Sequence, residues 1–117
     1  MYQAFIFLKN LLTNSAVITA QIPATNIYPI VAAASVQGDF IVYKIKRDKP
    51  YTKDNLMQYS CEVLIFADDI LEAAQKADIV ETELTNNNQI YGLSASVDYI
   101  EDFKKAYVKL DLTFKIN

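Results

Sequence analysis

Few side chains in this 117-residue chain have the chemistry that catalysis needs. Histidine, the usual general base near neutral pH and a common zinc ligand, does not occur, which excludes every Ser–His and Cys–His arrangement. Cys61 is the only cysteine, so the chain can form neither an internal disulfide nor a thiolate metal site. Gly38 and Gly92 are isolated, so the sequence contains no glycine-rich phosphate loop.

Carboxylates are the remaining candidates for acid–base or metal chemistry. The pairs Asp68–Asp69 and Glu101–Asp102 are adjacent in sequence, so their side chains diverge, and capping and turn roles explain them better than a catalytic dyad. Asp102-Phe103-Lys104, with Asp98 before it, has the carboxylate-x-lysine spacing of metal-dependent nucleases. That triplet must lie on a strand beside a second carboxylate, whereas here it falls in a predicted turn. We therefore expect no catalytic activity, no cofactor and no metal site.

Binding to nucleic acid is also disfavoured. The net charge is −3, and the basic residues of segment 44–54 read as a solvated hairpin tip. Eight tyrosines could form a stacking platform for bases. However, we place four of them on core-facing positions of strands: Tyr43, Tyr59, Tyr91 and Tyr99. Cys61 falls on the same kind of apolar face, which indicates a buried structural thiol rather than a nucleophile.

Two helices must cover these strands. Apolar residues recur at helical spacing over residues 2–13, and Thr13, Asn14 and Ser15 end that helix. Residues 69–85 form the clearest helix, with Asp69 and Glu72 spaced as in a capping box. Segment 16–38 is less regular because Pro23 and Pro29 forbid a long helix and make the residue before each extended.

Four segments alternate between apolar and polar residues as half-buried strands do: 39–47, 56–67, 90–100 and 106–116. In the third, the predicted inward residues are Tyr91, Leu93, Ala95, Val97 and Tyr99. The predicted fold class is α+β: a four-stranded, mainly antiparallel sheet built from two hairpins, one face covered by two helices, in the order α-β-β-α-β-β. Residues 1–117 form a single domain in this reading, and the other sheet face is polar and open. No apolar run approaches 18 residues, and the N-terminus lacks the features of a signal peptide, so we expect no contact with membranes.

Several stretches together resemble a known family. They are Ile27-Tyr28-Pro29, Phe40-Ile41-Val42-Tyr43, Phe66-Ala67-Asp68 leading into an Ala-rich helix, and a closing AYVKLDLTFKI. In this order the chain resembles, over residues 2–116, the tail-completion and tail-terminator (head–tail joining) proteins of long-tailed bacteriophages. None of these stretches is a catalytic signature.

The resemblance implies a structural role in the virion tail of a phage or prophage, with assembly in the cytoplasm of the bacterial host. Such proteins cap the head-proximal end of the tail tube as a ring, commonly of six subunits, and offer a surface to the head connector. The implied partners are copies of the chain itself, the tail-tube protein and the head connector protein. DNA would pass through the ring without being held specifically.

Two segments are candidates for contacts between chains. The first is the proline-stiffened arm around Ile27, Tyr28, Pro29 and Ile30, with the alternative that Ile27, Ile30 and Val31 cover the subunit's own core. The second is the basic hairpin tip with Arg47, Lys49 and Lys53, which could meet an acidic surface on a neighbour. A small α+β ligand- or peptide-binding module remains the alternative function, and an enzyme that uses only carboxylates and lysines is a further one.

Overall fold

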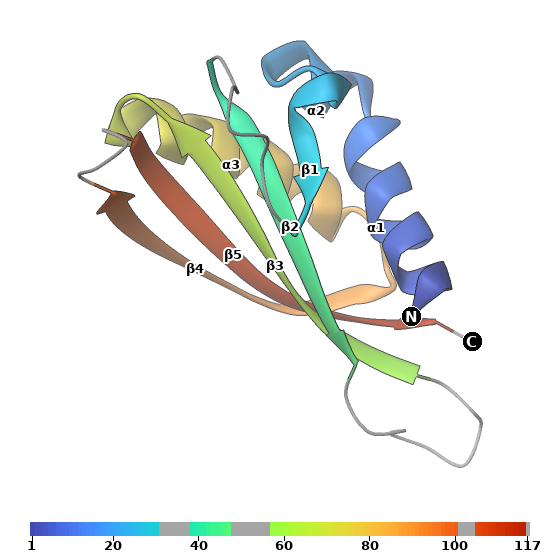
Figure 1. The fold of residues 1–117 in the computed structure, drawn as a ribbon. Helices are drawn as coiled ribbons and strands as arrows, with labels where there is room; N and C mark the ends of the chain where they lie inside the picture. The colour runs from blue at the N-terminus through green and yellow to red at the C-terminus, as the bar shows by residue number, and fades with distance from the viewer. Residues whose placement is uncertain (31–37, 48–56, 101–104, 117) are drawn as a thin grey trace.

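A five-stranded mixed sheet forms the centre of the computed structural model, which describes residues 1–30, 38–47, 57–100 and 105–116 (Figure 1). The strands lie in the order β1-β2-β3-β5-β4. Their bounds are Ile27–Pro29 (β1), Phe40–Arg47 (β2), Met57–Ala67 (β3), Ile90–Ile100 (β4) and Lys105–Ile116 (β5). β1 runs parallel to β2, and the other neighbouring strands are antiparallel.

Three α-helices in the described part of the chain cover one face of this sheet (Figure 1). They are α1 (Tyr2–Thr13), α2 (Ala16–Gln21) and α3 (Ile70–Thr85), and a short 3-10 turn, η1 (Ala24–Asn26), leads into β1. α3 contacts β3, β5 and β4, while α1 and α2 pack against α3 on the β1–β2 side. None of the described helices combines the length and apolar character needed to cross a membrane.

The predicted α+β class is confirmed, but the sheet was wrongly predicted to have four strands and the helical layer to have two helices. The missing elements all lie between residues 16 and 29, where the prolines suggested irregular chain. The Ser15 side chain caps α2 by accepting a hydrogen bond from the N–H of Ile18 at 3.2 Å. Pro29 is compatible with β1 because β1 lies at the edge of the sheet and is only three residues long.

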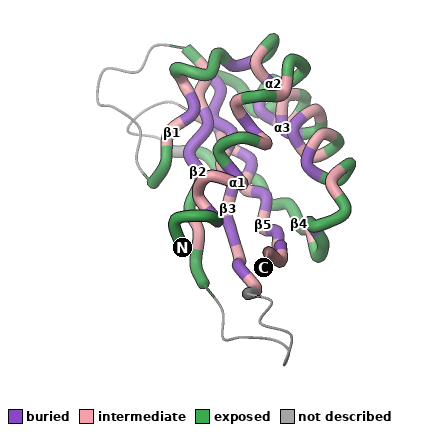
Figure 2. Tube along the Cα trace, turned by 90° about the vertical axis from the view of Figure 1, so that its right-hand side faces the viewer, coloured by how far each residue is buried: buried purple, intermediate pink, exposed green. Residues whose placement is uncertain are grey.

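The core lies between the helices and the sheet, and the predicted alternation of β3 and β5 is confirmed there. Phe114 is fully buried, and its ring stacks on Phe7 of α1 at 4.8 Å and on Tyr59 of β3 at 5.4 Å between centroids. These contacts join the first helix to the last strand. Figure 2 shows buried residues along β2, β3 and β5, whereas the residues of β4 are mostly exposed.

A β-bulge in β4 reverses part of its predicted alternation. Tyr91 pairs with Thr113, but the next matched pair is Ser94 with Asp111, so the register shifts between Tyr91 and Ser94. Gly92 occupies the bulge with a φ of 66°, a conformation that favours glycine. Tyr91, predicted to face the core, therefore lies on the open face instead.

Beyond the bulge, β4 regains the predicted orientation but not the predicted burial. Ala95, Val97 and Tyr99 pair with helix-facing residues of β5 and so share their face. Nevertheless all three are exposed. The prediction that Tyr91 and Tyr99 are core residues is wrong, while Tyr43 and Tyr59 are buried as predicted.

Candidate interaction surfaces

The face of the sheet opposite the helices carries charged side chains in its middle. Lys44 of β2 pairs with Glu62 of β3, and Glu62 pairs with Asp111 of β5. Lys109 lies between the two carboxylates, with its Nζ 3.9 Å from Glu62 Oε1 and 3.7 Å from Asp111 Oδ2. Opposite charges are thus interleaved on this face, which lowers its net field and keeps it solvated.

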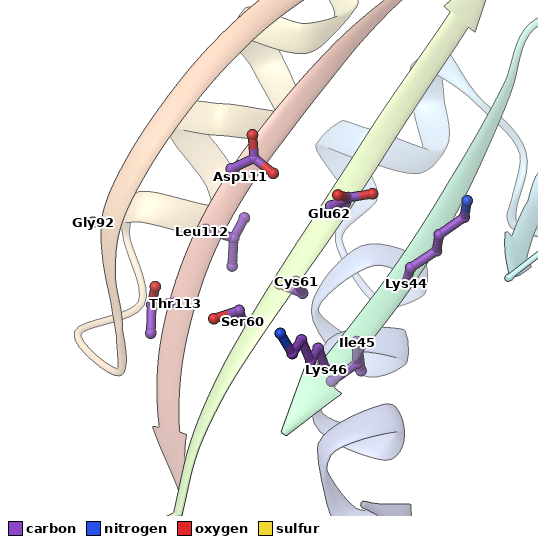
Figure 3. Close-up of a pocket in the computed structure, with 10 residues that line it drawn as sticks. All are labelled: Lys44, Ile45, Lys46, Ser60, Cys61, Glu62, Gly92, Asp111, Leu112 and Thr113. Carbon is purple, nitrogen blue, oxygen red and sulfur yellow. The ribbon is translucent and has the colours of Figure 1, made fainter. Parts of the chain in front are cut away.

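An open depression of about 380 Å³ lies over this part of the face (Figure 3). Its lining residues are Lys44, Ile45, Lys46, Ser60, Cys61, Glu62, Gly92, Asp111, Leu112 and Thr113. Ligand pockets are usually concave and mostly apolar, with a few converging polar groups. Here the polar groups of the lining carry both charges, and Glu62 and Asp111 already have Lys109 as a partner. The depression therefore fits a hydrated sheet surface better than a small-molecule site.

One end of the open face is aromatic, which the prediction of a polar face missed. Phe40 of β2 stacks on Phe66 of β3 at 4.5 Å between ring centroids, and Phe66 contacts Tyr107 of β5 at 5.1 Å. Phe66 is only 9% exposed, and Val42 beside it is also buried. This face is therefore apolar at the Phe66 end and charged in the middle.

The candidate nucleophile has the properties of a structural thiol. Cys61 is 3% exposed and lies in the hydrophobic core. Burial, and secondarily the negative charges of Asp111 and Glu62, raise the pKa of its thiol to about 12. Because the thiolate is the reactive form, Cys61 is inert near neutral pH in the folded protein.

In the described carboxylate pair Asp68–Asp69, Asp69 has the predicted capping role, whereas Asp68 forms an ion pair that was not predicted. Asp69 caps α3 by accepting a hydrogen bond from the N–H of Leu71 at 2.7 Å. Asp68 accepts a hydrogen bond from Lys105 Nζ at 2.5 Å, and this contact lowers the pKa of its carboxyl. Among the described residues, no cluster of three or more metal-ligating side chains exists. Glu101, Asp102 and Lys104 lie outside the described residues.

The predicted arm is divided between core and surface. Ile27 is 8% exposed and belongs to the hydrophobic core, Tyr28 is half-buried, and Pro29 is exposed. Ile30 is 60% exposed and has a φ of 68°, which is unfavourable for a β-branched residue. Its N–H donates to the carbonyl of Tyr43 at 2.8 Å, which fixes this conformation at the end of β1.

The predicted hairpin tip is described only at its first residue. Arg47 is exposed at the end of β2, and Lys49 and Lys53 lie outside the described residues. Pro29 pairs with Tyr43, whereas Arg47 lies four residues further along β2. The structure therefore places the arm and Arg47 on the same side of the sheet, beside different parts of β2.

Comparison with known proteins relates this fold to a virus-like particle. The chain is similar to one from a structure described as the virion of a native gene transfer agent (GTA) particle, with a TM-score of 0.64 and 14% sequence identity. The match covers 97% of this chain and 92% of that chain. No protein-family model and no curated protein matches the sequence. The likeness therefore concerns the fold, over nearly the whole length of both chains.

Proposed function

We propose that the protein is a structural subunit of a phage or prophage virion, and that it completes the tail. In this proposal, copies of the chain form a ring, with six subunits as the expected number, on the head-proximal end of the tail tube. The ring ends tube growth and joins the tube to the head connector. The observation that carries the proposal is the near-complete match in fold to a chain of a virion.

The properties of the described surfaces support a structural role. The thiol of Cys61 is buried and neutral, Asp69 caps α3, and the carboxylates in ion pairs are Asp39, Glu62, Asp68 and Asp111. The part of the molecule that the structure describes presents an open sheet face, exposed apolar side chains and two sheet edges. Arg47, together with Lys49 and Lys53, remains a candidate for contact with the tube or the connector.

The decisive experiment is deletion of the gene from the phage or prophage that encodes it, followed by negative-stain microscopy of the particles. We expect separated heads and tails, or tails of abnormal length, and joined virions when the wild-type gene is supplied from a plasmid. Normal virions from the deletion phage would refute the tail-completion role. In that case the depression on the open face would be the first place to test for a ligand- or peptide-binding function.

A further inference from the structure

Two strand edges on opposite sides of the sheet have no neighbour in the part of the chain that the structure describes. β4 is the last strand of the sheet, and no other described strand pairs with its outer edge. On the other side, β1 pairs with β2 only at Ile41–Tyr43, which leaves the outer edge of Lys44–Arg47 without a partner strand among the described residues. Free strand edges offer backbone groups to another chain.

The first of these edges is apolar with an acidic border, and we call it the acidic edge. Its exposed apolar side chains are Ile70, Leu71, Val97 and Tyr99, and its exposed carboxylates are Asp69, Glu72 and Asp98. Ala106 pairs with both Ala67 and Tyr99, and α3 begins shortly after Ala67, so the first turn of α3 lies beside the end of β4. The single cation of α3 and β4, Lys76, is already ion-paired with Asp39.

The opposite side is apolar with a basic border, and we call it the basic edge. It consists of the exposed side chains Tyr2, Ile30, Lys44, Lys46 and Arg47. The ring of Phe5 lies 6.2 Å from that of Tyr43, and the N–H of Ile30 donates to Tyr43. Tyr2 precedes Phe5 by one turn of α1, so Tyr2 and Ile30 lie on the same side of the molecule as Tyr43. Residues 1–30 contain one lysine and no carboxylate.

We propose that the acidic edge of one copy docks on the basic edge of the next copy, so that the chains associate head to tail around the ring. This inference rests on the proposed function, because it names the contact that builds the ring. Each edge exposes apolar side chains that association would bury, and the charges around them are complementary. Two acidic edges facing each other would place Glu72 and Asp98 against their own copies, which disfavours a symmetric dimer through this surface.

A head-to-tail contact also has the geometry that a ring requires. When two different surfaces pair, a row of subunits still has one unpaired acidic edge at one end and one unpaired basic edge at the other. The row closes into a ring if the rotation between neighbouring subunits brings these two edges together. The two edges lie on opposite sides of the same sheet, so a subunit can use both at once (Figure 1). Another virion protein on the acidic edge is the alternative occupant, and the following test separates the two.

A zero-length carbodiimide, which joins carboxylates to lysine amines in contact, tests the pairing directly. Equal amounts of ¹⁴N- and ¹⁵N-labelled protein are mixed at high concentration, cross-linked and analysed by mass spectrometry. We expect mixed-isotope links from Glu72 or Asp98 to Lys44 or Lys46. The absence of such links, or mixed-isotope links from the acidic edge to other lysines only, would overturn the proposal.

Charge reversal supplies a second test with a distinctive outcome. E72K/D98K and K44E/K46E should each lower the self-association constant, measured by sedimentation, at least tenfold. An equimolar mixture of the two variants should associate again. The mixture regains association because every contact again joins opposite charges. D78K/E81K, which makes the same change in net charge on a later part of α3, should associate as the wild type does. A mixture that stays as weak as its components would refute the head-to-tail pairing.

The two proposals fail in different ways. If the edges do not pair but the deletion phage still makes unjoined particles, tail completion stands and only this contact is wrong. If the edges pair but the deletion phage makes normal virions, the chain self-associates for another purpose.

Discussion

Replacing Phe114 tests whether the aromatic cluster that joins α1 to β5 holds the fold together. Leucine at this position keeps an apolar side chain in the core but removes the ring contacts with Phe7 and Tyr59. Buried aromatic pairs contribute about 0.5–1.5 kcal/mol each beyond the area that they bury, so the loss of two pairs predicts about 1–3 kcal/mol for Phe114→Leu. Phe114→Ala also leaves a cavity and should cost about 3–5 kcal/mol.

Urea denaturation followed by circular dichroism measures these differences in the free energy of unfolding. Thr113→Ala is the matched control, since Thr113 is the adjacent residue and lies on the open face, and it should change stability by about 0.5 kcal/mol or less. A double-mutant cycle between Phe7→Leu and Phe114→Leu should show a coupling of about 0.5–1.5 kcal/mol. If Phe114→Leu were as mild as Thr113→Ala, the cluster would not stabilise the fold. If Thr113→Ala were the more damaging change, the register of β5 would be wrong by one residue.

Three further perturbations test individual features of the structure. Gly92→Ala should lower the free energy of unfolding by about 1–2 kcal/mol because of the positive φ at this position. A steric clash is not the cause, since an added Cβ would meet its nearest atom, Thr113 Oγ1, at 3.7 Å. Gly92→Asn should be milder, and equal stability of the wild type and both variants would contradict the bulge. Because the pKa of Cys61 is raised from 9.0 to about 12, the contribution of its neutral thiol to stability is complete below pH 9 and is lost between pH 9 and 12. The free energy of unfolding of Cys61→Ala should therefore fall less steeply over that range than that of the wild type. A thiol reagent at pH 8 should modify the wild type only after unfolding. The lowered pKa of Asp68 means that its contribution is present above its ordinary value of 3.8 and disappears as the pH falls through the lowered pKa, so Asp68→Asn should differ from the wild type at pH 6 and converge with it in strong acid.

Most of the fold could be predicted from local patterns in the sequence. The helix over residues 2–13 has the predicted bounds, and the one that follows Asp69 begins and ends within one residue of its prediction. In both segments apolar residues recur at helical spacing over three or more turns, and polar residues typical of helix ends follow them. The elements between residues 16 and 29 are too short for periodicity to detect. The pairing of β1 with β2 depends on tertiary packing, although Ser15 was a usable signal for α2.

The candidate surfaces could be predicted less well, because burial depends on which strand lies at an edge. Residues 93–99 of β4 alternate in sequence as those of β5 do, yet Val97 and Tyr99 are exposed while Leu110 and Leu112 are buried. Strand order decides this difference, and the sequence does not state strand order. The bulge at Gly92 had one local signal, an isolated glycine inside a strand pattern. The arm around Ile27 was partly assigned to an interface, whereas the structure places Ile27 in the subunit's own core.

The strand order also has a consequence for the order in which a subunit folds. β2 and β3 form one hairpin and β4 and β5 another, and within the sheet the two hairpins are joined by the pairing of β3 with β5, in which Ala67 meets Ala106 and Met57 meets Ile116. Closing contacts so distant in sequence is slow compared with forming local hairpins, so this junction should be the late step of folding. The lysines and the arginine of the basic edge belong to the first hairpin, and the β4 residues of the acidic edge belong to the second. A half-folded chain could thus expose one edge but not both in a fixed relation, and it would end a growing ring rather than extend it.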